Sequence, residues 1–158
     1  MSHHRIRLLG PWEFLWHESA NDMAPLAVSG TTRLPQSWQS LFGSASGRAT
    51  FSRKFHRPTN LEPHERVFLV LTAVRGSGLA TLNTVVLGEF ASDGGSAEFD
   101  TTELLQAFNV LSIELAFSPN SADERPGGLF EPAVLEIRST ADHAARVTDT
   151  AVATKPTR

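Results

Sequence analysis

A period-two alternation of apolar and polar residues is the feature that most limits what this chain can fold into. In residues 111–117 every odd position is large and apolar and every even position is small or charged, the pattern of a strand with one buried face. Residues 133–138 repeat the pattern, and residues 67–74 are apolar on both faces, as expected of a central strand covered on both sides. These strands predict a common core that contains Phe51, Phe55, Leu111, Ile113, Leu115, Phe117, Leu135 and Ile137.

Turn residues separate the strand-like runs at short intervals. Proline and glycine recur between them as Pro25, Pro35, Pro58, Pro63, Gly76, Gly78, Gly94, Gly95, Pro119, Pro126, Gly127 and Gly128. Turns this frequent, with little helical periodicity, indicate an all-β fold, and we predict a jelly-roll β-sandwich of about eight to ten strands with one short helix. That helix should follow Asp100, which can cap its N-terminus, because Glu103 stands where a capping box requires it.

The length of 158 residues suits one globular domain with a hydrophobic core. We expect the sandwich domain to occupy residues 6–138, preceded by a flexible N-terminus over residues 1–5. Residues 139–158 contain no large aromatic side chain and only scattered valines. We therefore expect them to form a flexible tail or linker, since little burial could offset the entropy of ordering them.

Composition and charge exclude several classes of protein. The chain has no cysteine, which excludes disulfides, thiol catalysis and cysteine-ligated zinc. Its 14 basic and 17 acidic side chains give a net charge of −3, without the clustered Lys and Arg of a nucleic-acid-binding face. No apolar run is long enough to span a membrane. Residues 1–7 lack the apolar stretch of a signal peptide, so we place the chain in the cytoplasm by default and expect neither a nucleic-acid nor a membrane partner.

Sequence motifs for catalysis or metal binding are missing. The six histidines do not have the spacing of metal ligands. Residues 43–47 resemble a nucleophile elbow but carry Ala45 at the centre in place of serine. We therefore predict no catalytic residue, no metal site and no cofactor. The turn at Asp93, Gly94 and Gly95 leaves a structural calcium ion as an alternative.

Three acidic residues near the Gly127-Gly128 turn, Asp123, Glu124 and Glu131, invite an enzymatic interpretation. Glycoside hydrolysis uses two carboxyl groups at a defined separation, one of which keeps its proton. Nothing in the sequence would raise the pKa of one of these carboxyls above that of another. We interpret them as part of a solvated loop.

A series of short motifs, taken in order, resembles a known family. Residues 9–14, Leu-Gly-Pro-Trp-Glu-Phe, are similar to the opening “Leu-x-Gly-x-Trp-x-Phe” strand of the N-terminal sugar-binding domain of glycoside hydrolase family 2. That family contains β-galactosidases, β-glucuronidases and β-mannosidases. Similar matches follow at 34–38 (“Val-Pro-x-x-Trp”), 51–55 (“Tyr-x-Arg-x-Phe”), 66–69 (“Glu-Arg-Val-x-Leu”), 82–88 (“Val-Asn-Gly-x-x-Val-Gly”), 99–111 (“Phe-Asp-Ile-Thr … Gly-x-Asn-x-Leu”) and 127–135 (“Gly-Gly-Ile-x-x-Pro-Val-x-Leu”).

The resemblance implies a galactose-binding-domain-like jelly roll without catalytic activity. The catalytic glutamates of the family lie in a separate (β/α)₈ barrel, which needs about 250 residues, so we do not expect this chain to be an enzyme. Thr84 replaces the family's hairpin glycine. A β-branched residue tolerates positive φ poorly, and we therefore expect a different turn there. The amide of Asn109 is expected to satisfy backbone groups that the short helix leaves free.

Two functions remain open at this stage. The first is a non-catalytic carbohydrate-binding or glycosidase-accessory domain, in which aromatic faces stack on sugar rings and planar polar groups reach the hydroxyls. The second is a structural or protein-interaction β-sandwich, with a neighbouring domain or protein as partner and no small-molecule ligand. For the first we predict a shallow glycan site with Trp38 as the stacking platform, although each tryptophan is also suited to closing the open end of a sandwich. The candidate ligand-binding residues are Trp38, Arg33, Trp16, Arg125 and Phe130.

Overall fold

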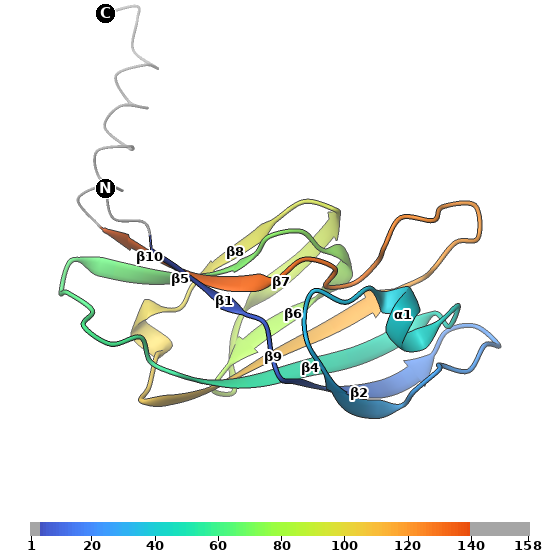
Figure 1. Cartoon of the computed structure of the whole chain (residues 1–158), viewed down its shortest axis with the longest axis horizontal. Helices are drawn as coiled ribbons and strands as arrows, with labels where there is room; N and C mark the ends of the chain where they lie inside the picture. The colour runs from blue at the N-terminus through green and yellow to red at the C-terminus, as the bar shows by residue number, and fades with distance from the viewer. Residues whose placement is uncertain (1–3, 140–158) are drawn as a thin grey trace, which may run out of the picture.

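The structure is a computed structural model that describes residues 4–139, which form ten strands, one short α-helix and one 3₁₀ turn (Figure 1). The elements in chain order are β1 (His4–Leu8), β2 (Trp12–Ser19), β3 (Ser29–Thr32), α1 (Trp38–Phe42), β4 (Gly47–His56), β5 (Glu65–Leu71), β6 (Arg75–Leu82), β7 (Val85–Asp93), β8 (Ala97–Asp100), η1 (Thr102–Leu104), β9 (Phe108–Phe117) and β10 (Ala133–Ser139). Within this described part, no helix has the length and apolar character needed to cross a membrane.

Two antiparallel sheets pack face to face, which confirms the predicted all-β sandwich. One sheet has four strands in the order β1-β10-β5-β8, and the other has six in the order β3-β2-β4-β9-β6-β7. From β4 onward the chain crosses repeatedly between the two layers, which are visible one above the other in Figure 1. In the six-stranded sheet, β4 and β9 lie at the centre and pair in one register over the full ten residues of each strand.

The predicted core is confirmed. Six of the eight side chains expected there are at most 6% exposed, and Phe55 is 9% exposed. Phe117 is partly buried and packs against the same cluster. The alternation predicts burial correctly because β4 and β9 turn their odd-numbered residues toward the four-stranded sheet. Phe51 therefore lies opposite Ile113 on the covered face.

The helix expected after Asp100 is wrong in extent: only the single 3₁₀ turn η1 forms there. Thr101 is still tied to the four-stranded sheet, because both its backbone N–H and its hydroxyl donate to the carbonyl of Val67. Asp100 does accept a bond from the N–H of Thr102, at 3.0 Å. Glu103, however, pairs with Arg66 and does not close a capping box. Since β9 begins at Phe108, one turn is all that the connection holds.

The α-helix of the fold, α1, lies between β3 and β4, where no helix was predicted. Ser37 caps it, accepting from the N–H of Ser40 at 3.1 Å. Gly43 ends it in a positive-φ conformation (66°) that favours glycine. In five residues the helix places Trp38 and Phe42 in the core. Gln39, which follows Trp38 in this helix, is only partly buried and lies at the end of the sandwich.

The hairpin between β6 and β7 also differs from the expectation. Asn83 and Thr84 both have positive φ, 51° and 70°, so the two-residue turn forms despite the β-branched threonine. Asn83 explains why: its side chain donates to Leu104 O and to Asn109 Oδ1 and accepts from the N–H of Val110. These bonds fix the turn from outside.

The described strands reach slightly beyond the expected sandwich of residues 6–138. Strand β1 begins at His4, which pairs with Ile137 of β10. Strand β10 continues to Ser139. The predicted flexible tail lies outside the described residues beyond that point.

Candidate functional site

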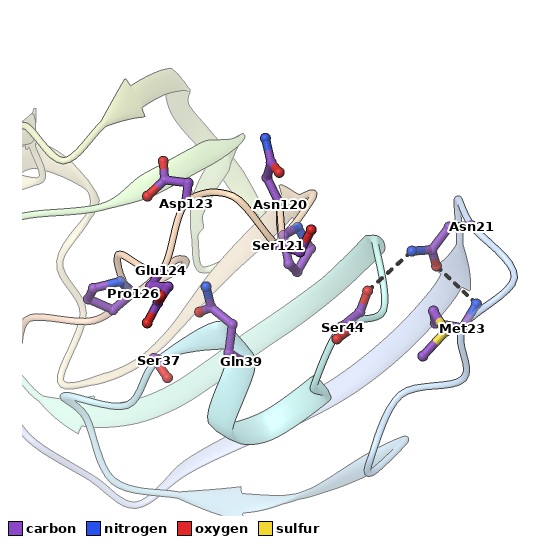
Figure 2. A pocket seen from close by; sticks show the side chains of 11 residues that line it. Asn21, Met23, Ser37, Gln39, Ser44, Asn120, Ser121, Asp123, Glu124 and Pro126 are labelled. Carbon is purple, nitrogen blue, oxygen red and sulfur yellow. Dashed lines mark hydrogen bonds between the residues drawn. The ribbon is translucent and has the colours of Figure 1, made fainter.

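An open groove at one end of the sandwich is lined mainly by polar residues. Figure 1 shows that α1 and the loop between β9 and β10 lie at the same end, near the loop that follows β2. Between these three segments is a cavity of about 570 Å³. Figure 2 shows its lining residues, which are Asn21, Met23, Ser37, Gln39, Ser44, Pro119, Asn120, Ser121, Asp123, Glu124 and Pro126.

A cluster of aromatic rings closes this end of the sandwich. Trp38 and Phe42 of α1 have ring centroids 4.7 Å apart, and Trp38 lies 5.8 Å from Phe117. Trp16 packs against Phe42 at 4.8 Å. Trp38 is only 1% exposed, and its indole N–H donates to the carbonyl of Ala45 at 2.9 Å. A buried ring has no face for a sugar, so the prediction that Trp38 is a stacking platform is wrong, and the indole closes the sandwich end.

The other four predicted site residues lie around the groove or away from it, and none lines it. Trp16 is half-buried against the aromatic cluster. Phe130 is half-buried, and Arg33 is exposed beyond the end of β3. Arg125 is exposed next to two lining residues, and its guanidinium pairs with Asp123 and Asp93. The structure therefore does not bring the five residues together as one site.

One wall of the groove is fixed by Asn21, which sequence reasoning missed. Its amide nitrogen donates to Ser44 O at 3.2 Å, and its Oδ1 accepts from the N–H groups of Ser46 and Met23, at 3.1 and 3.2 Å. The side chain thus ties the loop after β2 to the loop after α1 (Figure 2). Its hydrogen-bonding groups hold the groove together and do not simply point into solvent.

The opposite wall is fixed by Gln39 in the same manner. Its Nε2 donates to Arg125 O at 3.0 Å, and its Oε1 accepts from the N–H of Gly127 at 2.9 Å. The backbone of Trp38 adds a bond from its N–H to Gly127 O, also at 2.9 Å. Helix α1 therefore holds the loop between β9 and β10 from one side.

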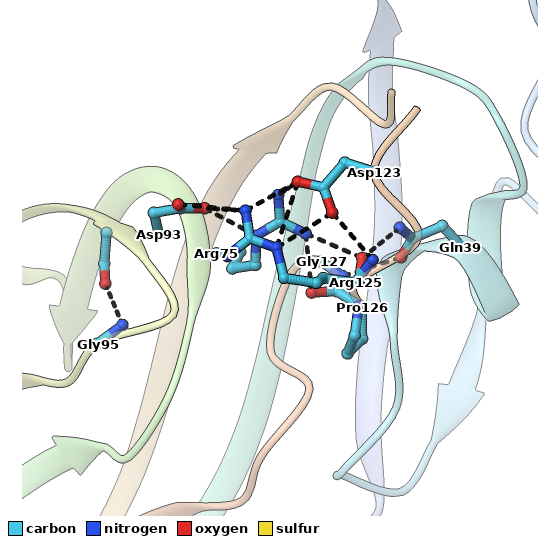
Figure 3. A network of polar contacts seen from close by, with 9 residues as sticks. Gln39, Arg75, Asp93, Gly95, Asp123, Arg125, Pro126 and Gly127 are labelled. Carbon is cyan, nitrogen blue, oxygen red and sulfur yellow. Dashed lines mark hydrogen bonds and ion pairs between the residues drawn. The ribbon is translucent and has the colours of Figure 1, made fainter. Parts of the chain in front are cut away.

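A network of two arginines and two aspartates holds the same loop from the other side (Figure 3). Arg75 pairs with Asp93 and Asp123, and Arg125 pairs with the same two carboxylates. The hydrogen bonds from Arg125 hold the pKa of Asp123 far below its usual range, and those from Arg75 and then Arg125 lower that of Asp93. Both carboxyls are therefore ionised at neutral pH and poorly suited to donate a proton.

Some polar groups of the groove are left for a ligand. Asn120 uses Oδ1 to accept from the N–H of Ala122. Within residues 4–139, its Nδ2 and the exposed carboxylate of Glu124 make no side-chain hydrogen bond to the protein. Among the same residues no three His, Asp or Glu side chains are grouped as metal ligands. Asp93, at the turn considered for calcium, is paired with arginines.

Comparison with solved structures identifies proteins that share this fold. An FMN-binding β-glucuronidase from Faecalibacterium prausnitzii matches with a TM-score of 0.69 and 19% identity, over 87% of this chain and 23% of that one. A Bifidobacterium dentium β-glucuronidase matches at 0.67 and 20%, over 87% and 30% of the two chains. A protein described as a β-galactosidase from Bacteroides fragilis matches at 0.68 and 16%, over 88% and 24%.

These matches confirm the resemblance at the level of the fold: the chain has the structure of one part of such glycosidases and spans between 23% and 30% of the three. No protein-family model and no curated protein sequence matches the chain.

Proposed function

We propose that this domain is a non-catalytic glycosidase-accessory domain that binds carbohydrate hydroxyls in the groove at its loop end. The observation that carries the proposal is that the polar walls of the groove are already held in place by internal hydrogen bonds. Asn21 ties the loop after β2 to the loop after α1, and Gln39 ties α1 to the loop between β9 and β10. A site that needs no ordering on binding loses less conformational entropy.

The chemistry of the lining suits a hydroxyl-rich ligand. The free amide nitrogen of Asn120 is a donor, and the carboxylate of Glu124 is a strong acceptor for a sugar hydroxyl. No aromatic residue is among the lining side chains, so binding depends on polar contacts. We therefore expect dissociation constants near the millimolar range, about −4 kcal/mol.

The absence of catalysis in this proposal follows from the two carboxyl groups that line the groove. A glycosidase acid must keep its proton near neutral pH. The lowered pKa of Asp123, caused first by its bonds from Arg125, removes that residue from the role. Glu124 lies exposed in an open loop and not in an apolar pocket of the kind that a glycosidase acid occupies.

The proposal is tested by an amide NMR titration of the domain with lactose, cellobiose and a simple alkyl glucuronide. Shifts should be confined to the loop after β2, to α1 and to residues 118–128. The variants Asn120→Ala and Glu124→Ala should weaken binding, whereas Glu89→Ala, an exposed glutamate on β7 outside the groove, should not. Shifts that cluster elsewhere, or none at concentrations well above millimolar, would reject the groove as a carbohydrate site.

A second candidate function, protein interaction, is favoured by exposed apolar side chains at the opposite end of β9. Phe108 is 72% exposed and Val86 56% exposed, and Val85 and Val110 are also exposed. Where such side chains form one patch, another protein typically covers them. Sedimentation velocity over a concentration series tests a second copy as the simplest partner. Association that Phe108→Ser abolishes would support this function, and a monomer at every concentration would exclude that partner.

A further inference from the structure

We infer that Arg75 is a positioning residue of the groove: from the first position of β6 it holds the β9–β10 loop in the shape that forms one groove wall. The consequence for binding rests on the proposed function. The effect on the loop itself is independent of it.

The contacts of Arg75 account for this role. Its Nη1 donates to Arg125 O at 2.8 Å and to Pro126 O at 3.2 Å, and its Nη2 donates to Asp123 Oδ2 at 3.1 Å. Its Nε donates to Asp93 Oδ1 at 2.9 Å. One planar guanidinium thus bonds three residues of the loop and one neighbouring turn, a geometry that a lysine ammonium cannot reproduce.

The guanidinium is itself rigidly seated. Its side chain is only 11% exposed, and it lies 5.2 Å from the ring centroid of Phe117, which belongs to the aromatic cluster beneath the groove. The backbone of Arg75 also exchanges two hydrogen bonds with Gly128, at 3.1 and 2.9 Å. The residue therefore connects the loop to β6 and to the aromatic cluster at once; Figure 3 shows its bonds to the loop.

The loop needs such an anchor because it contributes much of the groove and little of the core. Six lining residues come from it: Pro119, Asn120, Ser121, Asp123, Glu124 and Pro126. Leu129 is the buried large apolar side chain of the connection, and it lies beyond these six. Without the Arg75 guanidinium, the loop would keep the bonds of Gln39 on one side. On the other side it would keep the exposed Arg125–Asp93 pair and the backbone bonds to Gly128, so a ligand would have to order more of that side on binding.

Hydrogen exchange of loop amides tests the inference directly. In Arg75→Gln and in Arg75→Lys, the N–H groups of Gly127 and Gly128 should exchange roughly tenfold faster, while that of Ile113 in β9 keeps its protection. Arg48→Gln is the matched control, because Arg48 also pairs with two carboxylates, Glu18 and Glu114, but within residues 4–139 its side chain makes no hydrogen bond or ion pair with the loop. Unchanged exchange at both glycines in Arg75→Gln would overturn the positioning role.

The binding arm uses whichever of lactose, cellobiose or the alkyl glucuronide binds the unmodified domain. Affinity should fall roughly tenfold in Arg75→Gln, and less in Asp93→Asn, which removes one support of Arg75 outside the lining. Asp93→Asn also tests the positioning role if Arg75→Gln does not fold, since it too should speed exchange at Gly128.

A loosened loop with unchanged affinity would overturn the inference for binding while the proposed function stands. If no saccharide binds, the proposed function fails and the exchange result alone decides the role of Arg75.

Discussion

Replacing Asn109 by alanine should cause one of the largest losses of stability available to a single polar substitution in this domain. The side chain is 1% exposed and makes four hydrogen bonds. Its Oδ1 accepts from Gln106 N at 2.8 Å and from Asn83 Nδ2 at 2.9 Å. Its Nδ2 donates to Gln106 O at 2.9 Å and to Phe55 O at 3.3 Å. Every donor and acceptor of this amide is therefore satisfied.

The magnitude follows from what the deletion leaves behind. An intramolecular hydrogen bond contributes about 0.5–1.5 kcal/mol net, and a buried group that loses its partner costs about 1–3 kcal/mol. Gln106 would lose the partner of its N–H and of its C=O, whereas Asn83 keeps its bond to Leu104. We expect Asn109→Ala to lower the free energy of unfolding by about 3–4 kcal/mol, a large share of the roughly 5–15 kcal/mol of a typical domain.

Urea unfolding monitored by tryptophan fluorescence measures this loss, with Gln106→Ala as control because that side chain is exposed in the same segment. The control should change stability by less than about 0.5 kcal/mol. Asn109→Asp adds a second test, since a carboxylate facing two carbonyls at this depth should be worse at pH 7 than at pH 5, where protonation relieves it. A loss below about 1 kcal/mol in Asn109→Ala would show that water replaces the amide and that the network is not essential.

Three further predictions concern the core, the hairpin and the ion network. Ile113→Ala, at a fully buried site, should cost on the order of 2–5 kcal/mol in urea unfolding, and a cost below about 1 kcal/mol would contradict the assigned core face. Thr84→Gly should raise stability by about 0.5–1 kcal/mol, because φ is 70° there; a lower urea midpoint would contradict this. Asp93 and Asp123 have pKa values lowered on folding, so their stabilisation is present above about pH 4 and lost as the pH falls further. The urea midpoint of Asp123→Asn should therefore depend less on pH in that range, and an unchanged profile would contradict the assignment.

The strands of this fold could be predicted because alternation and burial have the same cause. Residues 111–117 alternate since β9 lies between two other strands with one face against the opposite sheet. The helices were harder to predict. A capping pattern at Asp100 was outweighed by the bonds of Thr101 to Val67, and five residues after Ser37 are too few for helical periodicity to show.

The groove could not be predicted, because its supporting residues are brought together by the fold alone. Gln39 bonds to Gly127, which is 88 positions away in the sequence, and Arg75 reaches Asp123 across 48 positions. Neither residue stands in a recognisable motif. The sequence did contain one usable signal: Asp123 and Glu124 beside a Gly-Gly turn mark the loop that carries half of the groove.

The burial of Trp38 limits how the proposed carbohydrate site is able to bind a sugar. Aromatic stacking and hydroxyl contacts are the two usual sources of affinity for sugars, and this sandwich uses its aromatic rings to close the end beneath the groove. The rings give α1 a rigid base, so Gln39 projects from a helix whose neighbouring side chain, Trp38, is locked. In the proposed site, affinity would then come from polar groups that are fixed in advance, because no ring among the lining residues could compensate for a loosely held donor. For that reason the restraint of the β9–β10 loop by Arg75 and Gln39 should matter more here than in a site built around an exposed tryptophan.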